Sequence, residues 1–255
     1  MKLALISDVH ANLEALEACL RDIEGEGVDR IYCLGDVIGY GPDPRQVADR
    51  VREVCAGIVR GNHEEIVTRA VPRRIAPIAA RAAFWTRRKL EPRSPKAPPK
   101  KVERWHTLRK LPTTIEVPDE GLLLAHGTPE DCFSYVLSVG DALRVFRRQL
   151  PASLPVCFIG HTHVPGFFFY DGRQIGFGLA EEGRRFEFGS HRLLVNAGSV
   201  GQPRDQDPRA CYAIWHGDGS FEFRRVEYDV ETTCRKIHGI PELPNALADR
   251  LLIGE

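Results

Sequence analysis

The feature that most constrains the fold is a series of five short apolar runs, each followed closely by polar residues that can bind a metal. Runs of this length that are rich in Val, Ile and Leu are typical of buried strands, so the polar residues lie where strands end. In an open α/β sheet, ligands bind at the carboxyl ends of the strands. The runs are LALIS before Asp8 and His10, RIYCL before Asp36, GIVR before Asn62 and His63, LLLA before His126, and VCFI before His161 and His163. We therefore expect these side chains to converge on one place.

The converging residues have the chemistry of a metal site. Seven of them offer nitrogen or oxygen ligands and none is a cysteine: Asp8, His10, Asp36, Asn62, His126, His161 and His163. Imidazole and carboxylate without thiolate suit Mn, Fe, Zn, Co or Ni and argue against an iron–sulfur cluster. Seven ligands are too many for one tetrahedral ion but suit two ions that share a bridging carboxylate. Such two-metal sites clamp the attacking and leaving oxygens of a displacement at phosphorus, and His63 is placed to donate a proton to the leaving oxygen.

These motifs (D-x-H, G-D, G-N-H-E, H and G-H-x-H), in this order, resemble the calcineurin-like metallophosphoesterase superfamily. Two further segments, YGPDP at 40–44 and NAGSVGQPR at 196–204, resemble its bacterial branch of phosphodiesterase-like and diadenosine-tetraphosphatase-related proteins. The resemblance covers essentially the whole chain. It implies an α/β fold (α+β in strict terms), built as a four-layer αββα sandwich of two packed mixed β-sheets flanked by helices.

The resemblance also implies a role for each site residue. One metal would be bound by Asp8, His10 and His163, the other by Asn62, His126 and His161, and Asp36 would bridge them. His63 would be the proton donor that also stabilises charge on the phosphorus oxygens. We expect two divalent transition-metal ions, Mn or Fe first, with Zn, Ni, Co and Mg as alternatives. The implied reaction is in-line attack of a metal-bridging hydroxide on a phosphate ester.

The second motif bears on substrate choice. Protein phosphatases of the superfamily continue it as G-D-x-x-D-R-G, and the Arg grips a phosphomonoester. Here Gly39 and Tyr40 occupy the places of that Asp and Arg, and neither can supply bidentate charge-assisted contacts to phosphate. We therefore expect a phosphodiesterase or a hydrolase of small nucleotides, with Arg204 as a candidate substrate contact.

Three alternatives remain beside this expectation. The first is a phosphomonoesterase or protein phosphatase, and the second is a dinucleoside polyphosphate hydrolase. The third belongs to another class, a non-catalytic scaffold on the same fold, and the presence of His63 argues against it. Nucleic acid is not expected as a partner, because the chain contains no recognisable recognition module.

Hydrophobic periodicity predicts one domain, residues 1–255, with an α/β first half and a strand-rich second half. Asn12 is expected to cap the first helix, Glu64 to pair with a nearby Arg, and the βαβαβ beginning to pair its strands in parallel. Helices are predicted at 12–25, 44–54, 75–90, 102–111, 139–150, 229–238 and 244–252, with an exposed loop at 92–101. Strands are predicted at 3–7, 30–34, 57–60, 114–117, 121–125, 155–160, 166–170, 173–177, 184–188, 192–196, 210–216 and 221–226.

Charge is distributed unevenly along the chain. It has 35 basic and 35 acidic residues, but residues 66–112 hold 14 Lys and Arg against two acids, Glu91 and Glu103, a local net charge of +12. We expect a basic, helical, lid-like insertion at about 66–112, whose positive field would attract phosphate substrates. A solvated Arg-rich face is the alternative.

The cysteine pattern and the apolar runs indicate the compartment. Seven isolated cysteines form no C-x-x-C pair, which is typical of reduced thiols in a cytoplasmic protein. No apolar run approaches the length of a membrane span, and the N-terminus has no signal-peptide pattern. The expected partners are small phosphate esters or nucleotides, with no membrane; the oligomeric state is not predicted.

Overall fold

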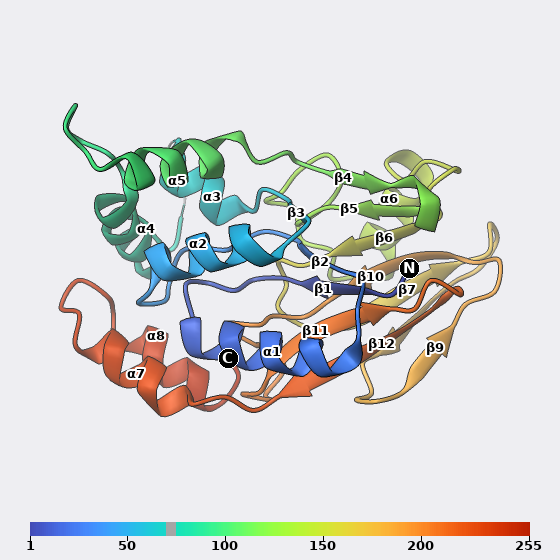
Figure 1. The fold of residues 1–255 in the computed structure, drawn as a ribbon. Helices are drawn as coiled ribbons and strands as arrows, with labels where there is room; N and C mark the ends of the chain where they lie inside the picture. Colours follow the sequence, from blue (N-terminus) through green and yellow to red (C-terminus); the bar gives the residue numbers. More distant parts are fainter. Residues whose placement is uncertain (70–74) are drawn as a thin grey trace.

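The computed structural model describes residues 1–69 and 75–255, and its strands form two six-stranded sheets (Figure 1). The strands of the first sheet are β1 (Leu3–Ile6), β2 (Arg30–Cys33), β3 (Gly57–Ile58), β9 (Arg185–Glu187), β11 (Ala210–Trp215) and β12 (Ser220–Val226). Those of the second are β4 (Ile115–Val117), β5 (Leu122–Leu124), β6 (Val156–Ile159), β7 (Gly166–Tyr170), β8 (Ile175–Leu179) and β10 (Arg192–Asn196). Their orders are β3-β2-β1-β11-β12-β9 and β4-β5-β6-β10-β7-β8.

Both sheets are mixed. In the first, β1, β2 and β3 pair in parallel, as the βαβαβ beginning predicts, while β11, β12 and β9 continue the sheet antiparallel. In the second, β5, β6 and β10 are parallel, and β4, β7 and β8 pair antiparallel at the two sides. The parallel strands end at the same edge of each sheet, and that edge carries the polar motifs.

Some helices cover the outer faces of the sheets, and the others gather beyond the ends of the strands (Figure 1). The helices are α1 (Leu13–Glu26), α2 (Pro44–Val54), α3 (Asn62–Thr68), α4 (Pro77–Leu90), α5 (Pro99–Lys110), α6 (Val139–Arg148), α7 (Val230–His238) and α8 (Ala246–Asp249), with 3-10 turns at Pro118–Glu120 and Arg250–Leu252. Helices α1 and α2 pack on the first sheet, and α6 packs on the second. The expected four-layer α/β architecture is confirmed.

The alternation of β1 explains why the sheets pack face to face. Leu3 and Leu5 point into the core between the sheets, whereas Ala4 and Ile6 point toward α1. Since a strand places successive side chains on opposite faces, a run that is apolar throughout buries both faces. The LALIS run thus specifies a central strand covered on both sides.

Several predicted boundaries differ from the observed ones. The last strand of the β7–β8 hairpin is shifted by two residues, to 175–179 from 173–177. Helix α5 begins at Pro99, inside the predicted 92–101 loop, because prolines are accepted in the first helical turn. Helix α3 was not predicted at all; its seven residues begin with the G-N-H-E motif itself. Asn12 does cap α1, with its side chain accepting a hydrogen bond from the Ala15 amide.

The described part of the basic segment, with residues 70–74 outside the described residues, consists of the end of α3 together with α4 and α5. Its charges are partly neutralised, because Lys100 and Arg104 pair with Asp49, and Arg88 pairs with Glu242. Helix α4 also packs through Ala82 and Trp85 against α7 and α8. In the described part of the chain, no helix has the length and apolar character needed to cross a lipid bilayer.

Candidate metal centre

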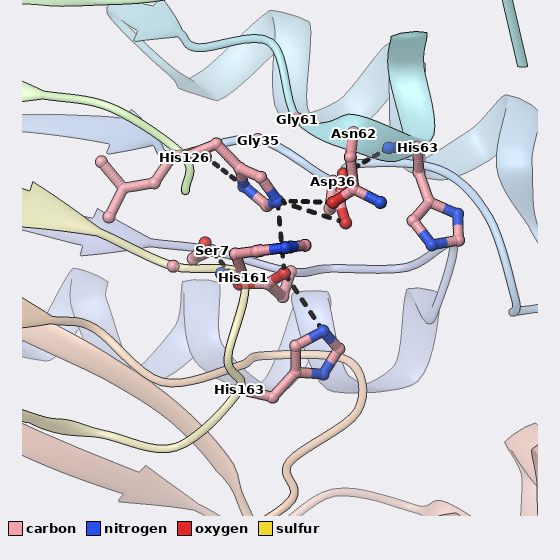
Figure 2. A network of polar contacts seen from close by, with 12 residues as sticks. Ser7, Gly35, Asp36, Gly61, Asn62, His63, His126, His161 and His163 are labelled. Atoms are coloured by element: carbon pink, nitrogen blue, oxygen red, sulfur yellow. Dashed lines mark hydrogen bonds and ion pairs between the residues drawn. The ribbon is translucent and has the colours of Figure 1, made fainter. Parts of the chain in front are cut away.

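The structure brings all eight predicted site residues of the five motifs together at one edge of the sheets. Figure 2 shows six of them: Asp36, Asn62, His63, His126, His161 and His163. Each of these side chains is buried. Asp8 and His10 follow β1, Asp36 follows β2, Asn62 and His63 begin α3, His126 follows β5, and His161 and His163 follow β6. The convergence therefore results from parallel strands that end at a common edge.

Within the centre, the side chains form two neighbouring groups. The ligand atoms of Asp8, His10 and His163 lie within 4.8 Å of one another, and so do those of Asp36, His126 and His161. Asn62 joins the second group, since its Oδ1 is 3.0 Å from His126 Nε2. The ligand atoms of a third combination, His10, Asp36 and His63, also lie within 4.8 Å of one another. Among the described residues these groups contain only Asp and His, so the donor set is free of thiolate.

The two aspartates are held in the same way. Asp8 Oδ2 accepts hydrogen bonds from Ser7 Oγ at 2.6 Å and from the His161 amide at 3.0 Å. Asp36 Oδ1 accepts one from the His63 amide at 2.8 Å. The other oxygens, Asp8 Oδ1 and Asp36 Oδ2, are buried and accept no hydrogen bond from the described residues. A buried charged oxygen without a partner is costly, and a cation in the centre would satisfy both.

Backbone carbonyls orient two of the imidazoles. His126 Nδ1 donates to Leu34 O at 2.9 Å, and His163 Nδ1 donates to Gln202 O at 2.5 Å. In their neutral form these imidazoles carry the proton on Nδ1, so each Nε2 atom then presents a lone pair to the centre, where a cation would take the place of a proton. Metal-binding histidines are commonly fixed by such a second hydrogen bond.

The backbone is strained where the site residues lie. Among the described residues, eight other than glycine have a positive φ, and five of them are site residues: Asp8, His10, Asp36, His161 and His163. Ala11 and Tyr40 follow the first two motifs closely in the chain. The eighth is Gln206. Such conformations cost free energy and cluster at functional sites. These backbone conformations orient the side chains at the strand ends toward a common point.

Two glycines make room for site side chains. A Cβ at Gly39, whose φ is +94°, would lie 2.1 Å from His63 Nδ1. A Cβ at Gly61 would lie 2.1 Å from Asp36 Oδ1. Larger residues at either position would therefore displace a predicted site residue.

Electrostatics favours positive charge in the centre. Burial alone would raise the pKa of Asp36, but His126 and His63 hold that pKa well below its usual range. Burial opposes protonation of His126, yet Asp36 and Asp8 raise its pKa to about 10. Burial and the neighbouring His126 charge lower the pKa of His161 to about 4. The carboxylates are thus ionised, as metal ligands must be.

Glu64 has a structural contact that differs from the prediction. It was expected to pair with an Arg, but its carboxylate accepts hydrogen bonds from the amides of Asp36, Ile38 and Gly61 at 2.9 to 3.2 Å. Among the described residues, backbone amides of the second and third motifs take the place expected for an arginine. Glu64 thereby ties the second motif to the third.

Two tyrosines complete the surroundings of the centre. The Tyr40 ring lies 4.3 Å from the His63 ring and 4.7 Å from the His10 ring, between centroids. Tyr135 stacks on His161 at 3.9 Å, with 48% of its surface exposed. No pattern around Tyr135 indicated this contact, which depends on the loop after β5. The predicted substrate contact Arg204 lies over Tyr40, with 6.0 Å between its guanidinium carbon and the ring centroid.

Comparison with known proteins agrees with this geometry. Residues 1–219 match the calcineurin-like phosphoesterase superfamily domain. The uncharacterized protein MJ0912 of Methanocaldococcus jannaschii is 32% identical over 266 residues, which cover 99% of this chain and 98% of the relative. The crystal structure of a metallophosphoesterase from Sphaerobacter thermophilus is 35% identical, with a TM-score of 0.83 over 100% of this chain and 99% of that one. Phosphodiesterase YfcE of Escherichia coli strain K12 is 38% identical over 72 residues, 24% of this chain and 39% of that protein.

The two packed sheets and the Asp/His centre at their edge define the class of an α/β metallophosphoesterase. The chain belongs to the calcineurin-like phosphoesterase superfamily.

Proposed function

We propose that this protein is a two-metal phosphodiesterase that hydrolyses small phosphate diesters or nucleotides. The observation that carries the proposal is the pair of Asp/His groups whose unbonded carboxylate oxygens, Asp8 Oδ1 and Asp36 Oδ2, face one centre. The donor set fits two hard or borderline divalent ions, with Mn or Fe proposed first and Zn, Ni, Co or Mg as alternatives. Two ions bound there would activate water and neutralise the charge of the phosphate.

The ligand roles proposed here follow the two groups. Asp8, His10 and His163 would hold one ion, and Asn62, His126 and His161 the other. Asp36 would bridge them, which its position supports: its Oδ2 lies 3.7 Å from His10 Nε2 and 3.4 Å from His126 Nε2, one histidine from each group.

His63 is proposed as the proton donor to the leaving oxygen. Its Nδ1 is buried against Gly39 and has no hydrogen-bond partner among the described residues, so we assign to Nε2 the bond to a substrate atom. Its backbone amide is fixed to Asp36, and its ring lies against Tyr40. These contacts hold the ring at the edge of the centre, where a leaving group would depart.

Tyr40 supports a preference for diesters. In the structure the residue at the place of the monoester-gripping Arg is a partly buried phenol, and burial raises its pKa above the ordinary value. A neutral phenol offers one hydrogen bond to a phosphate and no compensating charge, so the second negative charge of a monoester gains little there. The name of the relative YfcE, a phosphodiesterase, supports the same reading.

We further propose that residues 1–255 form one domain, with a basic helical insertion at about 66–112 that contains α4 and α5. We also propose that the protein is cytoplasmic, because its seven cysteines are free thiols. The ion pairs to Asp49 and Glu242 weaken the case for a lid that steers substrate.

A comparison of two model substrates tests the proposed activity. With Mn²⁺ or Fe²⁺ bound, kcat/KM for bis-p-nitrophenyl phosphate should exceed that for p-nitrophenyl phosphate, because the site offers no positive side chain at position 40 for a dianion. Protein stripped with a chelator and assayed without metal is the control and should turn over neither substrate. A higher kcat/KM for the monoester would contradict the diesterase assignment and favour the phosphomonoesterase alternative.

A further inference from the structure

Two half-buried arginines, Arg204 and Arg250, lie beside the metal centre without a counter-ion. Neither has a carboxylate oxygen within 4.0 Å among the described residues. The buried Nε atom of each likewise has no hydrogen-bond partner there. Arg204 Nη2 donates to Gln202 Oε1 at 2.7 Å, so its guanidinium is oriented without being neutralised.

The fold holds these two arginines in place next to the site. The Arg204 amide donates to the carbonyl of His163 at 3.2 Å, and the Gln206 amide donates to the carbonyl of Gly254 at 2.9 Å. The loop between β10 and β11 is therefore fixed both to the last site motif and to the turn that carries Arg250. Leu251, the next residue, lines the same small cavity as Tyr40 and His10.

Other half-buried or buried arginines in the described chain have partners. Arg104 binds Asp49, Arg225 binds Asp205, and Arg224 binds Asp22. Arg192 lacks a carboxylate but donates to the carbonyls at the end of α6. The pair beside the metal centre differs because neither guanidinium has such a partner, and burial together with the charge of Arg204 lowers the pKa of Arg250. Unpaired like charges of this kind are stabilised by an anion.

We propose that Arg204 and Arg250 form a subsite for a second phosphate group of the substrate, beside the phosphate that is hydrolysed. This inference rests on the proposed function and narrows it. The preferred substrates are then diesters that carry an additional phosphate monoester on the same small molecule, such as a nucleotide whose 5′-phosphate is esterified to a second alcohol and whose 3′-oxygen carries a phosphate monoester. The planar guanidinium groups supply the bidentate contacts that a phosphate dianion requires.

A matched pair of substrates tests the subsite. Thymidine 5′-(p-nitrophenyl phosphate) and its 3′-phosphorylated form share one scissile bond and one leaving group, and differ only in the additional phosphate. The native protein should prefer the 3′-phosphorylated form by about 10-fold or more in kcat/KM, the usual effect of a charge-assisted hydrogen bond. Arg204→Gln and Arg250→Gln should each reduce this preference severalfold. Arg21→Gln, at an exposed position on α1, is the matched control and should keep it.

Equilibrium binding separates this proposal from the proposed function. Thymidine 3′,5′-bisphosphate should bind the native protein more tightly than thymidine 5′-monophosphate by a similar factor, and the difference should shrink in Arg250→Gln. If neither substrate is hydrolysed while this binding preference is present, the proposed function fails and the subsite stands. If the native protein shows no preference for the second phosphate, or if both variants keep it, the subsite is overturned. If the Arg204→Gln protein does not fold, the preference of the Arg250→Gln protein for the second phosphate alone tests the subsite.

Discussion

Replacing His63 by alanine is expected to lower kcat by about 10²–10⁴-fold, the usual contribution of a positioned acid or base. The ring lies against Tyr40 with its Nδ1 unbonded, at the edge of the centre. Without it, an alcohol must leave as an unprotonated alkoxide. The loss should be large for a thymidine dinucleotide, whose leaving group is an alcohol, and much smaller for bis-p-nitrophenyl phosphate, whose phenolate leaves without a proton.

Metal content and a second histidine variant control this experiment. His63→Ala should retain both ions, and His106→Ala, at an exposed position on α5, should retain full activity. Equal losses for both substrates would show that His63 does not protonate the leaving group. Loss of an ion would instead make His63 a ligand, since its ring atoms also lie within 4.8 Å of ligand atoms of Asp36 and His10.

Asp36→Asn is expected to remove both ions and with them nearly all turnover. The asparagine oxygen can still accept the hydrogen bond from the His63 amide. Its NH2 group would then occupy the place of Oδ2, 3.4 Å from His126 Nε2, where it offers a donor instead of a negatively charged ligand. Elemental analysis of the purified variant should find less than one ion per chain.

Two variants separate this effect from general damage. His163→Ala should mainly weaken one of the two sites, because His163 belongs to the group of Asp8 and His10 alone. Asp119→Asn, at an exposed position in the turn before β5, should leave the metal content unchanged. An Asp36→Asn protein that keeps two ions would contradict the bridging role.

The architecture could be predicted well from the sequence because most strands correspond to short apolar runs that are visible locally in the chain. The strands 166–170 and 192–196 and the helix 44–54 were predicted with the bounds that the structure has. The motifs identified the edge of the sheets where the centre lies, since apolar runs and the polar residues that follow them are adjacent in the chain. Helix α3 was missed because its seven residues are too few to show a helical period.

Contacts between distant segments could not be predicted from the sequence. The carboxylate of Glu64 binds amides of the second motif, 26 to 28 residues earlier, and this pairing depends on how β2 and α3 pack. Tyr135 reaches His161 from the loop after β5. Its position carries no local signal, because only tertiary packing brings the side chain to the site.

The central claim is that two ions per chain support hydrolysis of phosphate diesters. A titration of metal-free protein with Mn²⁺, followed by both bound metal and bis-p-nitrophenyl phosphate turnover, tests it most directly. We predict that activity rises until two ions are bound per chain and then levels off. Full activity with one bound ion would contradict the two-metal centre, and two bound ions without turnover of any phosphate ester would identify the protein as a non-catalytic scaffold.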